Sequence, residues 1–428
     1  GRGSRILTLR SDPRAAGRRT NDREVSEAGR KRQKENGGRK MLLNMNSAQN
    51  CRHAGSEYSM HDRIYVCHTY YHVYIACLKE LNLPAEKRGG AELCLSSLSN
   101  DFRDLGKRAE ASGLFAAVWT FPEKPASDFP ELIELKKDRG NPVRNLWQRR
   151  RFDRKLAALE APFVPVDFRQ YRDIYVFCDS DPIGYYLAGN KIRYHALEDG
   201  LDCLVYYDAA RYDNRGNFRL KAWLARRGFL FMQNGYSRYC IDMEVNSISR
   251  LQFPGPKGKY VEVSREKLCQ GLTKEGRQIL TRLFIANLDE LTAKLHEAAS
   301  TGKPTILVLS EPLLPDLRDR KRLFRDLIRE NGTVNGRQGT IVIKPHPRDR
   351  LDYRKEFPEY IILDPFFPME VLNFIDGLMF DRVVTVYTVP DSLHCVREKV
   401  YLGDDFMDRY ESPEIHRQNE VVRQAERR

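Results

Sequence analysis

From residue 60 onward, short apolar runs alternate with longer segments whose apolar residues have helical spacing. The short runs predict strands and the longer segments predict helices. The expected strands are residues 63–67, 92–96, 115–121, 173–178, 191–196, 305–309, 340–343, 360–363, 382–386 and 399–402. The expected helices are 71–81, 101–111, 132–159 with a break at 140–142, 182–188, 274–299, 316–330 and 368–374. Strands that alternate with helices are typical of parallel sheets covered on both faces, so an α/β protein is predicted.

The alternation occurs in two blocks, separated by the less regular, Gly- and Pro-containing stretch 209–270 and the helical pattern of 274–299. We therefore expect two Rossmann-like, doubly wound domains that face a cleft, at 60–275 and 304–428, joined by a linking helix at 276–303. Ligands of such sheets bind beyond the carboxyl ends of the strands. Residues that directly follow strands are consequently the candidates for function.

The charge of the chain is unevenly distributed. It has 428 residues, with 72 Lys and Arg against 59 Asp and Glu, and residues 1–59 hold 14 of the former and 6 of the latter. This stretch has few aromatic residues and is expected to be a disordered basic tail. Such a tail could bind anionic lipid or nucleic acid. Because most of the excess charge lies outside the predicted domains, a nucleic-acid-binding protein is an alternative and not the main hypothesis.

The cysteines and the hydropathy bear on the cellular compartment in which the protein is expected. The nine cysteines are scattered without CxxC pairs, which fits a reducing environment and argues against a disulfide framework or a zinc knuckle. Cys77 and Cys178 fall in apolar patterns and are expected in the core. No stretch is apolar enough for a transmembrane helix, and the start lacks the apolar region of a signal peptide. We expect a cytoplasmic protein, with peripheral contact on the inner face of the plasma membrane left open.

Four polar loops follow predicted strands. In the first, Glu198 and Asp199 offer adjacent carboxylates for general-base chemistry, and Gly200 would permit a tight turn. In the second, Lys344-Pro345-His346-Pro347-Arg348, two prolines stiffen a cationic segment that suits a phosphate. The third is Ser310-Glu311-Pro312 and the fourth runs from Thr385 to Ser392. Their hydroxyls could donate to phosphate or carboxylate, or simply cap helices.

Metal binding has weaker support in the sequence. Asp179-Ser180-Asp181 has the DxD pattern of metal-dependent transferases, but Pro182 follows directly and makes Asp181 a predicted helix N-cap. His68 and His72 have a spacing that could bind a metal, but no third ligand is expected nearby, so packing or substrate lining is favoured. GxGxxG, P-loop, HExxH and GxSxG motifs are absent.

Taken in order, the motifs EDG, SEP, KPHP, PMEVL and the Ser/Thr-rich strand exit resemble those of glycosyltransferase family 52, the bacterial lipooligosaccharide sialyltransferases. The acidic-acidic-Gly and His-Pro motifs are also similar to those of capsular polysialyltransferases. The resemblance covers residues 62–405, including the opening strand and the DSDP segment. Each motif is short, and the specificity lies in the ordered set.

The resemblance implies a two-domain GT-B enzyme that uses a CMP-sugar donor and a glycan acceptor. By this resemblance, Glu198 or Asp199 is the catalytic base, with Glu198 preferred. His346 and Lys344 match the family residues that contact the CMP phosphate. Glu370 in PMEVL would lie near the cytidine ribose. The residues expected to bind the donor are Gly200, Ser310, Lys344, Pro347, Glu370, Thr388 and Ser392. The match at Thr388 and Ser392 is loose, because the family has adjacent hydroxyl residues there.

The expected reaction is an inverting, metal-independent transfer of sialic acid from CMP-sialic acid to a cell-surface glycan such as lipooligosaccharide or capsule. The leaving group has a single phosphate, whose developing charge a cationic loop can neutralise without a metal. The alternative within enzymes is a GT-B transferase that uses another CMP- or CDP-linked donor, Kdo-like or glycerol phosphate. No cofactor and no nucleic acid are expected, and a homodimer is left open.

Overall fold

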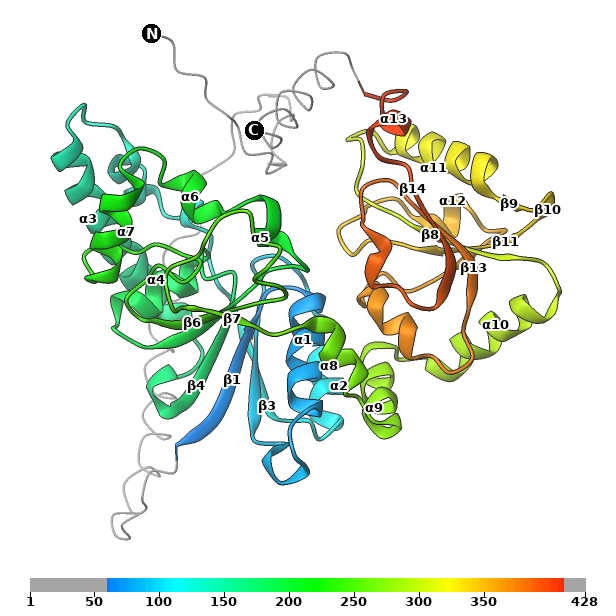
Figure 1. Ribbon diagram of the computed structural model, residues 1–428, viewed down its shortest axis with the longest axis horizontal. Coiled ribbons are helices and arrows are strands. Elements are labelled where there is room, and N and C mark those ends of the chain that lie inside the picture. Colours follow the sequence, from blue (N-terminus) through cyan, green and yellow to red (C-terminus); the bar gives the residue numbers. More distant parts are fainter. Residues whose placement is uncertain (1–59, 412–428) are drawn as a thin grey trace, which may run out of the picture. The chain divides into compact units, whose positions relative to one another are not determined.

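Residues 60–411 are described by a computed structural model, and they build two parallel β-sheets (Figure 1). The predicted basic tail at 1–59 lies outside the described residues, as do residues 412–428. A short antiparallel pair, β9 and β10, accompanies the second sheet.

The first sheet has seven parallel strands in the order β3-β2-β1-β4-β5-β6-β7. The strands are β1 His61–Cys67, β2 Ala91–Ser96, β3 Phe115–Phe121, β4 Tyr171–Phe177, β5 Tyr194–Leu197, β6 Cys240–Val245 and β7 Tyr260–Glu262. The chain first winds outward from β1 to β3 and then returns to continue from β4 on the other side of β1. The order therefore reverses between β1 and β4, which is where doubly wound sheets bind ligands.

Helices cover both faces of this sheet. Alternate residues of β1 point to opposite faces: Tyr65 and Cys67 pack with α1 and α2, whereas Ile64 and Val66 pack with α4. The α-helices are α1 Tyr70–Leu81, α2 Leu105–Ala111, α3 Pro142–Glu160, α4 Pro182–Gly189, α5 Cys203–Tyr206, α6 Ala209–Asp213, α7 Phe218–Arg226 and α8 Arg265–Gln270. The 3-10 helices are η1 Ala85–Lys87, η2 Ala126–Asp128, η3 Pro130–Leu132, η4 Glu134–Lys136, η5 Ala161–Phe163 and η6 Phe168–Gln170.

The second sheet has five parallel strands in the order β12-β11-β8-β13-β14. Its order reverses between β8 and β13. The strands are β8 Thr305–Leu309, β11 Thr340–Lys344, β12 Ile361–Ile362, β13 Phe380–Thr385 and β14 Val396–Tyr401, with the pair β9 Thr333–Val334 and β10 Arg337–Gln338. The helices are α11 Leu317–Asn331, α12 Tyr353–Glu356 and α13 Gly403–Met407, with η7 Met369–Phe374 and η8 Pro390–Ser392.

The two sheets confirm the prediction of an α/β protein with two Rossmann-like domains. Two expectations were wrong. The single helix over 274–299 is two helices, α9 Lys274–Phe284 and α10 Leu288–Ser300, and the helix expected over 132–159 has only 3-10 turns before the break at 140–142. The backbone of Ile285 is extended, with φ −113° and ψ 101°, and Asn287 precedes the second helix. Strands β6 and β7 were missed, because β6 mixes charged and apolar residues and β7 is a short edge strand.

Membrane-spanning helices were also sought. Among residues 60–411, no helix is both long enough and apolar enough to cross a bilayer.

We predict that Gly184 is indispensable to the turn between β4 and α4. A Cβ at this position would lie 1.9 Å from the backbone oxygen of Asp179, an atom held by the chain itself. Gly184→Ala should therefore lower the free energy of unfolding by about 3 kcal/mol or more, at the upper end of overpacking costs. Gly200→Ala is the matched control, because a Cβ there meets nothing within 4 Å. Equal urea-unfolding midpoints for the two variants would contradict the prediction.

Candidate active site

Three neighbouring strands of the first sheet deliver polar side chains to one edge. His68 follows β1, Cys178 follows β4, and Glu198 with Asp199 follows β5. The strands are paired in parallel and in close register, Val66 beside Val176 and Phe177 beside Leu197, so their carboxyl ends meet. These residues therefore gather at the point where the strand order reverses.

Asp199 is the exposed carboxylate of this group. Its side chain is 60% exposed, and its Oδ1 accepts hydrogen bonds from His72 Nε2 at 2.9 Å and from Cys178 Sγ at 2.7 Å. The other oxygen, Oδ2, has no hydrogen-bond partner among residues 60–411. Burial acts to raise the pKa of Asp199, but the hydrogen bonds from His72 and Cys178 outweigh it and lower that pKa well below its usual range. Asp199 is thus ionised, with one oxygen available.

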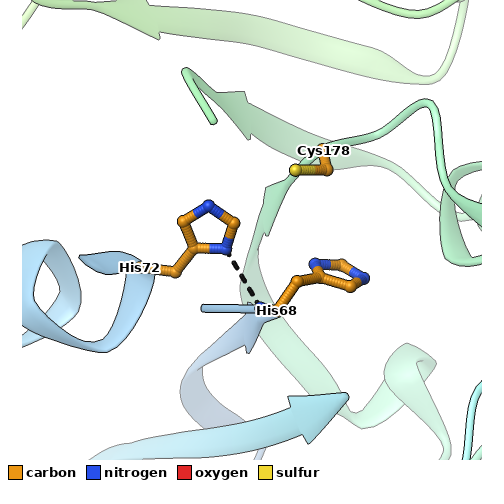
Figure 2. A group of neighbouring side chains, drawn as sticks. All are labelled: His68, His72 and Cys178. Carbon is orange, nitrogen blue, oxygen red and sulfur yellow. Dashed lines mark hydrogen bonds between the residues drawn. The ribbon is translucent and has the colours of Figure 1, made fainter. Parts of the chain in front are cut away.

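His72 is fixed in one tautomer. Its Nδ1 accepts a hydrogen bond from the backbone N–H of His68 at 3.0 Å (Figure 2). The ring proton of the neutral imidazole therefore lies on Nε2 and is donated to Asp199. The ring is buried and stacks on Phe177 with centroids 4.3 Å apart. Burial lowers the pKa of His72, which keeps it neutral. His72 therefore holds Asp199 in place as a neutral hydrogen-bond donor.

Glu198 occupies a different environment from its neighbour. It is 2% exposed, and its two oxygens accept backbone N–H groups, Leu204 at 3.4 Å and Asn246 at 2.6 Å. Burial raises the pKa of Glu198. This carboxylate ties the loops after β5 and β6 together. Gly200, expected to be needed for a tight turn, does not have the positive φ that favours glycine, and open space surrounds the position of its missing Cβ.

The expected core position of Cys77 is confirmed, but that of Cys178 was wrong. Cys178 is partly exposed, has a φ of +53°, and donates its thiol proton to Asp199. The apolar strand ends one residue earlier, at Phe177, so the pattern gave no sign of the change in direction. Burial raises the pKa of the Cys178 thiol, which keeps it a donor.

The DSDP segment is built into the protein. Asp179 is 2% exposed and accepts from the backbone of Asn234 and from the hydroxyl of Tyr194, each at 3.0 Å. Asp181 is the N-cap residue of α4, as expected, with Pro182 in the first turn, although its side chain makes no capping hydrogen bond. Both oxygens of Asp179 are thereby used within the fold.

His68, His72 and Cys178 each offer a ligand atom within 4.8 Å of the others (Figure 2). The expectation that no third ligand is near the two histidines was therefore wrong. The buried Nδ1 of His68 has no partner, and its Nε2 hydrogen-bonds Glu123 at 2.8 Å, an arrangement common for metal-binding histidines. His72 does not fit, because a ring that accepts a backbone N–H at Nδ1 would have to lose its Nε2 proton to bind a metal.

In the second sheet, His346 lies in the loop after β11. Its backbone N–H donates to Ser310 Oγ at 3.0 Å, and its Nδ1 accepts the N–H of Arg348 at 3.1 Å. Burial, then the charges of Arg348 and Lys344, lower the pKa of His346 to about 4. The ring is therefore neutral near pH 7, with its proton on Nε2, an atom without a partner among the described residues.

Lys344 is more deeply buried than a phosphate-binding lysine was expected to be. It is 5% exposed, and its Nζ donates to the carbonyl oxygens of Pro345 at 3.1 Å and Pro365 at 3.0 Å. The ammonium also lies 4.4 Å from the ring centre of Phe367. Burial lowers the pKa of Lys344 to about 7. With a neutral His346, the loop carries less fixed charge than its sequence indicates.

Two of the three hydroxyls expected to bind the donor, those of Ser310 and Ser392, are used inside the fold. Ser310 is 3% exposed and hydrogen-bonds Asp349 at 3.3 Å as well as His346, so it positions the histidine loop. Ser392 donates to the buried Glu370 at 3.0 Å. Burial raises the pKa of Glu370. Pro347 lies between His346 and Arg348, and its side chain has no polar atom that could contact the donor.

Glu311 was placed in the SEP loop without a role. Buried behind the loop that follows β13, it accepts from Thr385 Oγ1 at 3.0 Å and from the backbone N–H groups of Tyr387 at 2.9 Å and Thr388 at 2.6 Å. It therefore sets the conformation of that loop. Thr388 itself is partly exposed, and its hydroxyl has no hydrogen bond in the described part of the chain.

The two groups of residues belong to different sheets, and no hydrogen bond joins them among residues 60–411. Tyr71 lies on α1. Burial raises its pKa, and so do the carboxylates of Glu370, beside the second sheet, and Glu198, beside the first. The side chain of Tyr71 is therefore within electrostatic reach of both.

The sequence was then compared with known proteins. The sequence model of glycosyltransferase family 52 matches residues 132–389, which is more than half of the chain. The chain belongs to glycosyltransferase family 52. This confirms the predicted family and the prediction that the protein is a glycosyltransferase. The matched region includes Asp199 and His346, the residues at the centre of the two groups.

Other similarities are more distant. A protein described as uncharacterized from Haemophilus influenzae is 32% identical over 90 residues, which covers 20% of this chain and only 28% of the relative's length. The fold is similar to an α/β-galactoside α-2,3-sialyltransferase from Photobacterium phosphoreum, with TM-score 0.47, 11% identity, and 79% and 90% of the two chains covered. It is also similar to the GT-B domain of a Photobacterium damselae sialyltransferase, with TM-score 0.45, 10% identity, and 79% and 99% covered.

We predict that Lys344 makes stability rise with pH. Its pKa is about 7 in the folded protein and roughly 10.4 when unfolded, so between these values the unfolded state binds more protons. The free energy of unfolding should therefore increase from pH 7 to pH 10, by up to about 4 kcal/mol from this residue. Lys344→Met should lack that increment, because it cannot titrate.

Urea unfolding of both proteins at the two pH values measures the effect. Lost hydrogen bonds to Pro345 and Pro365 shift the variant's stability at both pH values alike, so the comparison rests on the difference between pH values. Identical pH dependence of the two proteins would show that Lys344 is not a buried amine of lowered pKa.

Proposed function

We propose that this family 52 enzyme is an inverting, metal-independent transferase that moves sialic acid, or a closely similar sugar, from its CMP-linked donor to a glycan hydroxyl. The observation that carries the proposal is Asp199: an exposed, ionised carboxylate with a free oxygen, held at the point of strand reversal. Family membership supplies the reaction class. Lipooligosaccharide or capsule remains the proposed acceptor class.

Asp199 is the proposed base, in preference to Glu198. Its Oδ2 would take the proton from the acceptor hydroxyl as that oxygen forms a bond to the anomeric carbon of the sugar. Oδ1 meanwhile keeps the hydrogen bonds from His72 and Cys178. Both oxygens of Glu198 already accept backbone N–H groups, which leaves that carboxylate without a free oxygen for the substrate. Attack by the acceptor opposite the leaving group gives inversion.

The leaving phosphate of CMP is the proposed ligand of His346. As the bond between the anomeric carbon and the phosphate oxygen breaks, its electron pair stays on CMP and negative charge grows there. The Nε2 proton of His346 is a neutral donor already oriented by Arg348 and Ser310, and it can stabilise that charge without reorganising. A phosphate near Lys344 would raise the pKa of that lysine and recruit its positive charge.

Donors other than CMP-sialic acid remain in the proposal. The features that favour CMP over a diphosphate are the modest charge of the loop around His346 and the absence of a free DxD carboxylate at Asp179. A CMP- or CDP-linked donor with a Kdo-like sugar or glycerol phosphate would fit the same groups. Membership of a glycosyltransferase family supports a nucleotide-sugar donor over nucleic-acid binding, the other alternative.

We predict that Asp199→Asn and Glu198→Gln fail in different ways. The amide oxygen that Asp199→Asn introduces can still accept the proton of His72, so the fold should persist while turnover falls by about 10²–10⁴-fold, the usual loss for a general base. In Glu198→Gln, the side-chain NH2 group would face one of the two backbone N–H donors that now bind the carboxylate. This substitution should lower the free energy of unfolding by about 1–3 kcal/mol. Steady-state kinetics and thermal melts separate the two. Loss of turnover in Glu198→Gln alone, in protein that is fully folded, would assign the base to Glu198.

We further predict that His346→Ala weakens CMP binding and also slows turnover. The Nε2 donor contacts the phosphate both before and during bond cleavage, so the loss of affinity should be of the order of tenfold to a hundredfold, as for hydrogen bonds to charged groups. Calorimetry with CMP in the presence of EDTA measures it, and wild-type affinity should be unchanged by the chelator. Asp199→Asn is the matched control and should bind CMP like the wild type. The reverse pattern in the two variants would exchange their roles.

A further inference from the structure

Helices α3 and α7 carry exposed apolar side chains beside exposed basic ones. We call this surface the α3–α7 face. Its apolar members are Val143, Trp147, Leu220 and Trp223, whose exposed fractions are 63%, 55%, 52% and 48%. Its basic members are Arg144, Arg151, Arg154, Lys155, Arg219, Arg226 and Arg227, all exposed. The chain has three tryptophans, and two of them lie on this face.

The two helices meet at the segment that follows α7. The ring of Trp147, on α3, lies 5.5 Å from that of Phe229, and the guanidinium of Arg150, also on α3, lies 4.2 Å from the same ring. Arg149 donates to the backbone oxygen of Phe231 at 3.4 Å. Helix α3 therefore packs against the segment that directly follows α7, so the exposed residues of the two helices lie on neighbouring parts of the surface.

Neither helix of this face presents an exposed carboxylate, although Asp138, in the segment before α3, hydrogen-bonds Asn145. In the described part of the chain, none of its seven basic residues forms an ion pair with a carboxylate. The acidic residues of α3, Asp153 and Glu160, are 8% and 0% exposed, and Asp153 is taken up by Arg149 and the backbone of Phe231. Helix α7 contains no acidic residue. An ordinary solvated helix face mixes both signs of charge, and this one does not.

We propose that the α3–α7 face docks on the surface of an anionic lipid bilayer. Tryptophan and leucine flanked by arginine and lysine are the pattern of helices that lie in a membrane interface, with the rings at the headgroup level and the cations on anionic phosphates. A nucleic acid would use the arginines but would give Val143 and Leu220 no apolar environment. An acidic protein could pair with the basic residues of this face, but it would not need the exposed aliphatic side chains. The proposal does not depend on which donor the enzyme uses or on which carboxylate is the base.

The full-length protein is tested with vesicles of phosphatidylglycerol and phosphatidylcholine, and with vesicles of phosphatidylcholine alone. Wild-type protein should sediment with the anionic vesicles only, less at high salt, and its tryptophan emission should shift to the blue. Removing three charges with Arg151→Gln, Arg154→Gln and Arg226→Gln should weaken vesicle binding roughly a hundredfold. These side chains are exposed, so circular dichroism should show an unchanged fold.

The matched control removes three charges elsewhere, with Arg318→Gln, Arg322→Gln and Arg325→Gln on α11. Two of these arginines pair with nearby Asp316 and Asp319, and the change in net charge is the same. The control should bind vesicles like the wild type, which also separates the α3–α7 face from the basic segment 1–59. A second variant, Trp147→Ser with Trp223→Ser, should weaken binding and abolish the blue shift.

Four results would overturn the proposal: no binding of the wild type to anionic vesicles, equal losses in the α3–α7 variant and the α11 control, wild-type binding by the double tryptophan variant, or capture of RNA that the vesicles cannot displace.

Discussion

One hydrogen bond, from the backbone N–H of His68 to Nδ1 of His72, determines the chemistry of the first-sheet site. A backbone amide can only donate, so the ring nitrogen it meets cannot carry the proton of a neutral imidazole. The proton is placed on Nε2, where it holds Asp199, and His72 is thereby made a poor metal ligand although Cys178 completes the spacing of a metal site. The orientation of the proposed base therefore depends on a main-chain group at the end of β1.

The sequence predicted the parts of the fold that follow from hydrophobic periodicity. The strands at both points of reversal, β1, β4, β8 and β13, are apolar runs bounded by polar residues, and the loops after β5 and β11 were placed at the correct edge. It failed where periodicity carries no information. The break at Ile285 lies inside a continuous apolar helical pattern, and β7 is too short to show a period.

The sequence also could not assign a burial to each polar residue. Ser310, Lys344 and Ser392 were expected to contact the donor, because they lie in motifs that resemble those of the family. In the structure their polar atoms bond to Asp349, to proline carbonyls and to Glu370. Cys178 was assigned to the core because it directly follows an apolar strand, and only its φ of +53° turns it toward Asp199. These are consequences of tertiary packing, which one chain read in isolation does not contain.

A common arrangement explains why carboxylates are so numerous at the strand ends. Glu198 and Glu311 each accept backbone N–H groups from the loop after a neighbouring strand, and Glu123 accepts the N–H of Ile183 in the same manner. A buried carboxylate with two or three such donors satisfies amides that a strand leaves unpaired at its end, and it keeps the loop rigid. Asp199 differs because its partners are side chains bonded to one oxygen only. The pattern EDG does not separate its two carboxylates, but the donors on each oxygen do, and they support Asp199 as the proposed base.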